Sequence, residues 1–132
     1  MRTRHIWVVA VLVGALAGCG SEKELASPAA KPGAQQVADA IAAKWPLPNP
    51  RDTSDGCKAK QGDTGPGCTS RVTTDAVTVT EWPDEQTAKK AADLGKTNGA
   101  RQAGRYVLTW NGDQDLTSDE ARADMVRIAG SL

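Results

Sequence analysis

The chain is poor in the residue types on which many enzyme active sites depend. Its 132 residues include a single histidine, His5, and no phenylalanine. If His5 leaves with an N-terminal signal, no imidazole remains for a general base, a Ser-His-Asp triad or a histidine-ligated metal. The sequence also contains no complete phosphate-binding loop and no Gly-x-Gly-x-x-Gly fingerprint. We therefore predict no catalytic residue of these classes, no metal site and no cofactor. A mechanism based on a serine–lysine pair or on paired carboxylates stays open.

Neither sign of charge is in surplus. The chain has 16 lysines and arginines and 16 aspartates and glutamates, and without Arg2 and Arg4 the balance is 14 to 16. Binding to nucleic acid needs a basic face that neutralises phosphates, so we expect no nucleic-acid partner. The length suits one small domain with a modest core.

The longest apolar run lies at the N-terminus, over residues 6–16. Arg2 and Arg4 precede this run, and the small residues Ala17 and Gly18 follow it. A positive start, a short apolar region and small residues after it are typical of a secretory signal peptide. A membrane span needs roughly 20 apolar residues, so the run is too short for one.

The four residues Leu16-Ala17-Gly18-Cys19 resemble the lipobox of bacterial lipoproteins. The resemblance implies that a signal peptidase recognises Leu16, Ala17 and Gly18, and that Cys19 becomes the mature N-terminus. It also implies that Cys19 carries acyl chains such as palmitate, which would hold the exported protein at the outer face of the cell membrane. An ordinary signal peptide followed by a chance cysteine is the alternative.

This interpretation divides the chain into three parts. Residues 1–18 form a lipoprotein signal peptide, residues 19–33 form the lipidated cysteine and a flexible tether, and residues 34–132 form a single extracytoplasmic domain. The tether is small, polar and proline-containing, and it lacks apolar periodicity.

Two cysteines remain once Cys19 is assigned to lipid. Cys57 and Cys68 then form a pair in an exported compartment that permits disulfides. The segment between them contains three glycines and one proline, which lets its ends meet. We predict a disulfide, and we interpret the charged residues around it as solvated. A zinc site is disfavoured because it needs four ligands, and a catalytic thiol would require an unpaired cysteine.

Apolar periodicity predicts an α+β domain, with a small antiparallel or mixed sheet of about three strands, about three helices on one face and one disulfide. The segment 69–73 and the period-2 segment 76–82 are expected to form a hairpin, or one longer strand with a bulge. Helices are predicted over 34–45, 83–94 and 117–132, and the third strand is predicted over 102–110.

Alternation along the strands assigns the two faces of the sheet. The apolar face should carry Tyr106, Leu108 and Trp110 from the last strand and Val77 and Val79 from the preceding one. The opposite face would then carry a possible interaction surface formed by Trp82, Arg105 and Val107. The alternative is that Trp82 folds over the sheet edge and packs on the helix that follows it.

The stretch Val77-Thr78-Val79, the segment 104–110 and the alanine-rich composition resemble small uncharacterised lipoproteins of high-G+C Gram-positive bacteria. This resemblance implies no particular activity or binding residue. We expect a lipid-anchored extracytoplasmic binding or accessory module of the cell envelope, whose partners are the membrane, through Cys19, and an envelope protein. A histidine-independent envelope enzyme is the alternative.

Overall fold

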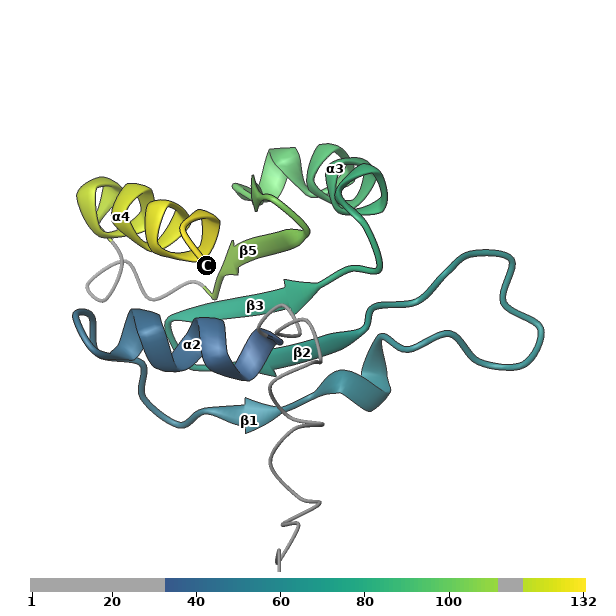
Figure 1. Cartoon of the computed structure of the whole chain (residues 1–132), viewed down its shortest axis with the longest axis horizontal. Helices are drawn as coiled ribbons and strands as arrows, with labels where there is room; N and C mark the ends of the chain where they lie inside the picture. Colours follow the sequence, from purple (N-terminus) through teal and green to yellow (C-terminus); the bar gives the residue numbers. More distant parts are fainter. Residues whose placement is uncertain (1–32, 112–117) are drawn as a thin grey trace, which may run out of the picture. The chain divides into compact units, whose positions relative to one another are not determined.

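The structure is a computed structural model, and it describes residues 33–111 and 118–132. In this part of the chain, three α-helices accompany a five-stranded antiparallel sheet, as predicted for an α+β domain (Figure 1). The helices and strands are α2 (Ala34–Ala42), β1 (Arg51–Asp52), β2 (Ser70–Thr73), β3 (Val77–Glu81), α3 (Glu85–Leu94), β4 (Arg101–Ala103), β5 (Tyr106–Trp110) and α4 (Asp119–Gly130). Short 3-10 helices, η1 (Ser54–Gly56) and η2 (Lys96–Asn98), lie between them.

The sheet is larger than the sequence predicted. Its strand order is β1-β2-β3-β5-β4, and every neighbouring pair is antiparallel. The expectation of about three strands is wrong for two reasons. The strand predicted over 102–110 is a hairpin, because Gly104 has a φ of +58° and turns the chain between β4 and β5. The short strand β1 pairs with β2 within a segment that has no strand pattern.

The helices lie on both faces of the sheet, so the expectation of three helices on one face is also wrong. Helices α2 and α4 pack on each other and on one face, where α2 contacts β2 and β3 and α4 contacts β4 and β5. Helix α3 contacts β4 and β5 and packs with Val107 in a separate cluster. Helix α3 therefore covers apolar side chains, such as Val107, that point away from the main core.

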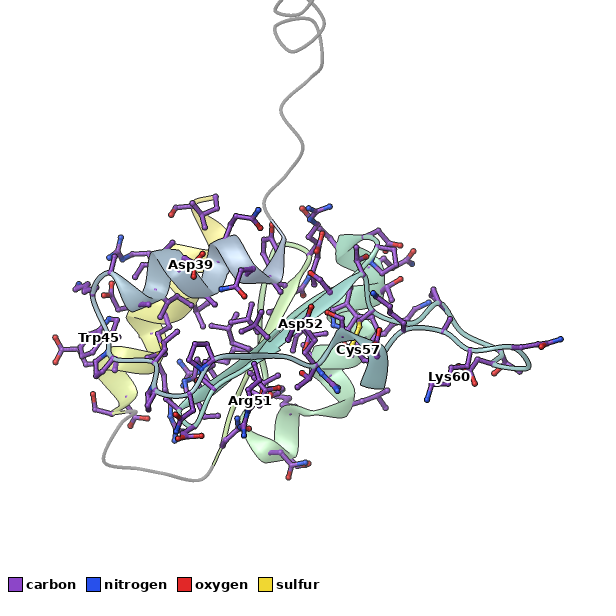
Figure 2. All side chains as sticks on the ribbon, turned by 90° about the horizontal axis from the view of Figure 1, so that it is seen from below. Asp39, Trp45, Arg51, Asp52, Cys57 and Lys60 are labelled. Carbon is purple, nitrogen blue, oxygen red and sulfur yellow. A yellow bond between two sulfur atoms is a disulfide. The ribbon has the colours of Figure 1, made fainter. Side chains whose placement is uncertain are left out.

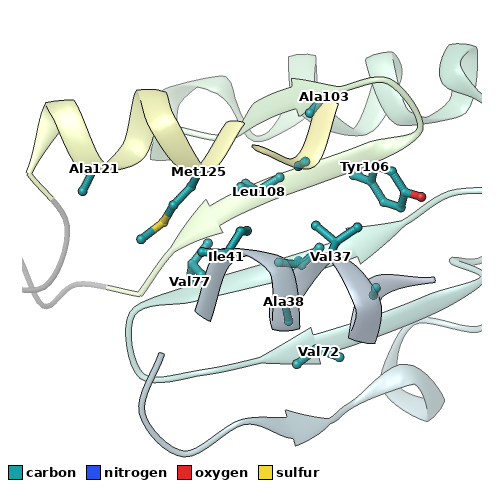
Figure 3. Close-up of a cluster of buried hydrophobic side chains, with 13 residues drawn as sticks. Val37, Ala38, Ile41, Val72, Val77, Ala103, Tyr106, Leu108, Ala121 and Met125 are labelled. Carbon is teal, nitrogen blue, oxygen red and sulfur yellow. The ribbon is translucent and has the colours of Figure 1, made fainter. Parts of the chain in front are cut away.

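The main core fills the space between the sheet and helices α2 and α4 (Figure 3). The predicted face assignment is confirmed, because Tyr106, Leu108, Val77 and Val79 are all buried in this core and Trp110 packs against it. Alanines supply much of the helical contribution, and small side chains let a helix approach the sheet closely. The buried alanines of α2 and α4 are Ala34, Ala38, Ala121 and Ala129.

The predicted hairpin between β2 and β3 is confirmed, and Thr74 stabilises its turn. The Thr74 hydroxyl accepts hydrogen bonds from the backbone N–H groups of Ala76 and Val77, at 3.2 and 2.9 Å. It also donates to the Val77 carbonyl oxygen at 2.8 Å. Thr74 is buried, and its hydroxyl provides hydrogen-bond partners for backbone groups at the turn that water does not reach.

Helix boundaries differ from the predictions where side chains cap the backbone. Helix α3 begins at Glu85 rather than at Pro83, because the Asp84 carboxylate accepts a hydrogen bond from the Thr87 N–H at 2.8 Å and makes Asp84 the N-cap. Leu94 lies next to the alanine stripe of this helix, which predicts burial, yet 87% of it is exposed. Helix α2 ends at Ala42, three residues before Trp45.

A carboxylate side chain lies on the core face of the sheet. Glu81 follows Val77 and Val79 at the spacing of two residues, and it is 4% exposed. Its Oε1 lies 2.8 Å from Nη2 of Arg105, and its Oε2 accepts a hydrogen bond from the Ser70 hydroxyl at 2.5 Å. Ser70 Oγ in turn accepts from the Ala34 N–H, the first in α2, at 2.9 Å. This network joins the start of α2 to the strands β2 and β3 and to the turn between β4 and β5.

We predict that Glu81→Gln lowers the free energy of unfolding by about 3 kcal/mol, because it removes the buried carboxylate charge that lies 2.8 Å from the Arg105 guanidinium. Replacing both residues, as Glu81→Leu with Arg105→Met, should cost less than Glu81→Gln alone. Urea unfolding measures both effects. Asp93→Asn is the matched control, since it breaks an exposed pair with Lys89 that is worth about 1 kcal/mol at most. Equal losses in Glu81→Gln and Asp93→Asn would contradict the prediction.

Candidate functional site

The predicted lipidation site lies outside the described residues. Leu16, Ala17, Gly18 and Cys19 belong to residues 1–32, so the structure does not test the lipobox or the tether. Among the described helices, none is long and apolar enough to cross a bilayer.

The predicted disulfide between Cys57 and Cys68 is confirmed, and it closes the longest run of exposed residues among those that the structure describes. We refer to residues 57–68 as the disulfide loop. The Cα atoms of the two cysteines lie 5.3 Å apart, and the Cys68 N–H donates to the Cys57 carbonyl oxygen at 2.8 Å. Residues 58–66 are all exposed. Figure 2 shows Lys60 on this loop, beyond Cys57 and on the opposite side of the domain from Trp45.

The base of the disulfide loop is tied to the sheet through η1. The Arg71 side chain donates from Nε to the Thr53 hydroxyl and from Nη2 to the Thr53 carbonyl oxygen, both at 3.0 Å. Ser54 is buried, and its hydroxyl accepts from the Arg71 N–H at 2.9 Å. Two hydrogen bonds from Ser54 hold the pKa of the Asp52 carboxyl below its ordinary value. The disulfide therefore lies directly after η1, a segment that these hydrogen bonds already hold against β2.

The predicted interaction surface of Trp82, Arg105 and Val107 does not form one exposed face. Val107 is 4% exposed, because α3 covers β5 and packs Ala88 and Ala92 on it. Arg105 is engaged with Glu81. Trp82 is half-buried and packs against the α3 cluster, which is the alternative considered from the sequence. The expectation of an uncovered face is therefore wrong at Val107.

A second cluster lies at the far end of α2. Asp124 of α4 accepts hydrogen bonds from the Trp45 indole Nε1 at 2.9 Å and from Arg127 Nε at 3.0 Å. The Lys44 ammonium lies 2.5 Å from the same carboxylate. The hydrogen bonds from Lys44, Trp45 and Arg127 together hold the pKa of Asp124 far below its ordinary value. An open groove of about 300 Å³ runs along these residues and also includes Glu120.

This groove is better explained as a junction between helices than as a catalytic site. Both oxygens of Asp124 are already engaged, so Asp124 is not available as a general base. The groove brings a lysine and two carboxylates together without a serine, so it does not complete a serine–lysine pair. Sequence reasoning missed this cluster because Lys44 and Asp124 are 80 positions apart and no local pattern joins them.

For Trp82, we predict that substitution by alanine lowers the free energy of unfolding by about 2–3 kcal/mol, somewhat less than a fully buried tryptophan would cost. The reason is loss of apolar contact with α3. Leu94→Ala on the same helix is the control, and its effect should stay within about 0.5 kcal/mol because the side chain is exposed. Unfolding curves followed by circular dichroism measure both. A Trp82→Ala protein as stable as the control would show that the ring does not pack.

For Asp124, we predict that substitution by asparagine lowers the melting temperature at pH 7 and that this deficit shrinks as the pH falls below 4. The ordinary pKa of the carboxyl is 3.8, and its pKa in the folded state is lower. Its contribution to stability is therefore present above pH 3.8 and is lost as the pH falls towards the folded-state pKa. Thermal unfolding of both proteins from pH 7 to pH 2 measures the deficit. A deficit that is constant over this range would refute the role of ionised Asp124.

The described residues bring no group of three or more histidine, cysteine, aspartate or glutamate side chains into a position to hold a metal ion. The disulfide loop, in contrast, is an ordered polar surface that the core does not cover.

In comparisons with known proteins, no family model and no curated protein matches the sequence, and no solved structure matches the fold.

Proposed function

We propose that this protein is a lipid-anchored extracytoplasmic binding or accessory module of the cell envelope, held at the outer face of the membrane through Cys19. The observation that carries the proposal is the division of the three cysteines. Cys57 and Cys68 form a disulfide, and disulfides persist in exported proteins. Cys19 is left over directly after Leu-Ala-Gly, at the end of an apolar run with a positive start.

Binding is supported over catalysis because the polar side chains inside the domain and at the Asp124 cluster are engaged with one another. Ser70, Glu81 and Arg105 interact with one another at the end of the sheet, and Asp124 is engaged by Lys44 and Trp45, which follow α2, and by Arg127 of α4. The longest run of exposed residues in the described part of the chain, 58–66, lies in the disulfide loop and carries amide, hydroxyl, ammonium and carboxylate groups suited to contacts with another molecule. No observation on the described residues favours the histidine-independent enzyme over this role.

The attachment is tested by Cys19→Ser in cells that produce the full chain. A diacylglyceryl group inserts two acyl chains at about 0.8 kcal/mol per buried CH₂, which is enough for stable anchoring. We expect the wild-type protein to incorporate labelled palmitate and to fractionate with membranes. The Cys19→Ser protein should stay uncleaved by the lipoprotein pathway or appear in the soluble fraction, without label. Ser21→Ala, two residues beyond the lipobox, is the control and should behave like the wild type.

A Cys19→Ser protein that is processed and fractionates as the wild type does would overturn the lipid anchor.

A further inference from the structure

The face of the sheet opposite the main core is only partly covered. Helix α3 packs on β4 and β5, and Figure 1 shows it beyond β5, away from β2. Side chains that alternate with the buried core residues of β2, β3 and β5 point to this second face, and several of them are half-buried. We refer to five of them as the threonine face: Arg71, Thr73, Thr78, Thr80 and Thr109.

The threonine face is aligned by the register of the strands. Thr73 of β2 lies opposite Thr78 of β3, and Thr78 lies opposite Thr109 of β5. Arg71 lies opposite Thr80 in the same way. Because neighbouring strands are about 4.8 Å apart, three hydroxyl groups form a row that crosses three strands.

Hydrogen bonds fix much of this row. The Thr53 and Thr73 hydroxyl oxygens lie 2.8 Å apart, and the Thr73 and Thr78 hydroxyl oxygens lie 3.4 Å apart. Asn111 Nδ2 donates to the Thr78 hydroxyl at 3.0 Å, and Arg71 Nε donates to the Thr53 hydroxyl at the other end. The polar groups are therefore held in place before any ligand binds, which lowers the entropy that binding would cost.

Arg71 supplies a positioned charge at the edge of this row. Its side chain is half-buried and held by two hydrogen bonds to Thr53, and within the described chain no ion pair includes it. Asp52 lies opposite Val72 of the main core, so its side chain belongs to the other face of the sheet. A partly buried charge without a counter-charge costs free energy, and an anionic ligand would supply that counter-charge.

The charges beside the threonine face are paired. Arg51 lies opposite Thr73, and its guanidinium is 3.6 Å from the Asp75 carboxylate. Next to η1, the Lys58 ammonium lies 3.8 Å from the Asp55 carboxylate. The surplus on this face is therefore the single positive charge of Arg71, beside four hydroxyl groups.

We infer that the threonine face binds an anionic glycan of the cell envelope. The inference rests on the proposed function and names the class of ligand on which it acts. Arginine is suited to carboxylate and phosphate oxygens, and Arg71 Nη1 makes no hydrogen bond within the described chain. Threonine hydroxyls both donate and accept, so an aligned row of them matches the hydroxyl groups of a sugar chain.

A glycan is favoured over a protein partner by the composition of the face. The centres of protein interfaces are rich in tryptophan, tyrosine and arginine, whereas threonine is under-represented among the residues that dominate binding. The threonine face has four threonines and no aromatic side chain among its five residues.

The test measures cosedimentation of the full acylated chain, in detergent micelles, with insoluble envelope glycan from the producing cells, freed of protein and nucleic acid. We expect Arg71→Gln to lower the association constant about tenfold, because a charged hydrogen bond is lost. Thr80→Glu should lower it at least as much, since its carboxylate would lie opposite Arg71 and compete with the ligand anion. Circular dichroism and thermal unfolding show whether each variant is folded.

Matched variants separate charge from shape. Thr80→Gln, similar in size to Thr80→Glu but neutral, should lower the association constant threefold at most, on the order of one neutral hydrogen bond. Thr97→Glu, at an exposed residue of η2, adds the same charge on another surface and should leave binding unchanged.

Two treatments of the glycan identify the anionic group. Hydrofluoric acid removes phosphodiester-linked polymers, and carbodiimide coupling to glycinamide neutralises carboxylates. We expect one of the two treatments to abolish the difference between the wild type and Arg71→Gln. Wild-type binding that survives both treatments in sequence would contradict an anionic ligand.

The other outcomes overturn the inference in separable ways. No cosedimentation of the wild type, or equal cosedimentation of wild type, Arg71→Gln and Thr80→Glu, would remove the threonine face as a glycan site. Equal losses in Thr80→Gln and Thr80→Glu would remove the role of charge. Competition by polyglutamate as effective as that by soluble envelope glycan would assign the face to an acidic polypeptide. Each of these leaves the proposed function standing, whereas a soluble, unlabelled wild-type protein in the Cys19 experiment would overturn the proposed function itself.

Discussion

The arrangement of the domain depends on one buried carboxylate at the end of the sheet. Glu81 forms an ion pair with Arg105 and accepts a hydrogen bond from Ser70, and Ser70 accepts from the first N–H of α2. A buried charge is costly unless it is paired and hydrogen-bonded, so these partners must come together for the fold to form. Burial of Glu81 thereby sets where α2 begins on the sheet and where the β4–β5 turn lies.

The rest of the core is built from small side chains, and this explains how the domain is reinforced. Alanines on α2, α3 and α4 bury little apolar area each, and the large fully buried side chains are few. A domain of this kind gains from tertiary links outside the core. The Asp124 cluster joins the end of α2 to α4, and the disulfide closes a segment that the sheet does not pair. Both links lie at the surface, where they leave the sheet undisturbed.

The two links differ in what they leave for a partner. In the Asp124 cluster, Lys44 and Arg127 both contact the Asp124 carboxylate, and Glu120 also lines the groove, so the formal charges of the groove balance. In the disulfide loop, one oxygen of the exposed Asp63 carboxylate accepts from the Lys60 N–H, and no ion pair within the described part of the chain includes the Lys60 ammonium. An ordered surface with an available charge suits recognition, because both specificity and the rate of encounter depend on electrostatic complementarity. Because Asp63 offsets Lys60 in the loop, this criterion favours the threonine face, where no ion pair within the described chain includes Arg71.

Local sequence pattern determined the α+β class, the hairpin of β2 and β3 and the apolar face of the sheet, because periodicity and alternation are properties of neighbouring residues. The pairing of Cys57 with Cys68 followed from the small number of cysteines in the chain. The burial of Glu81 on the core face, two residues after Val79, and its pairing with Arg105 were not predicted. Tertiary structure alone decided that α3 covers Val107, that β1 joins the sheet and that Asp124 meets Lys44. Each of these depends on which element packs on which face, and that choice is made by contacts between residues far apart in the chain.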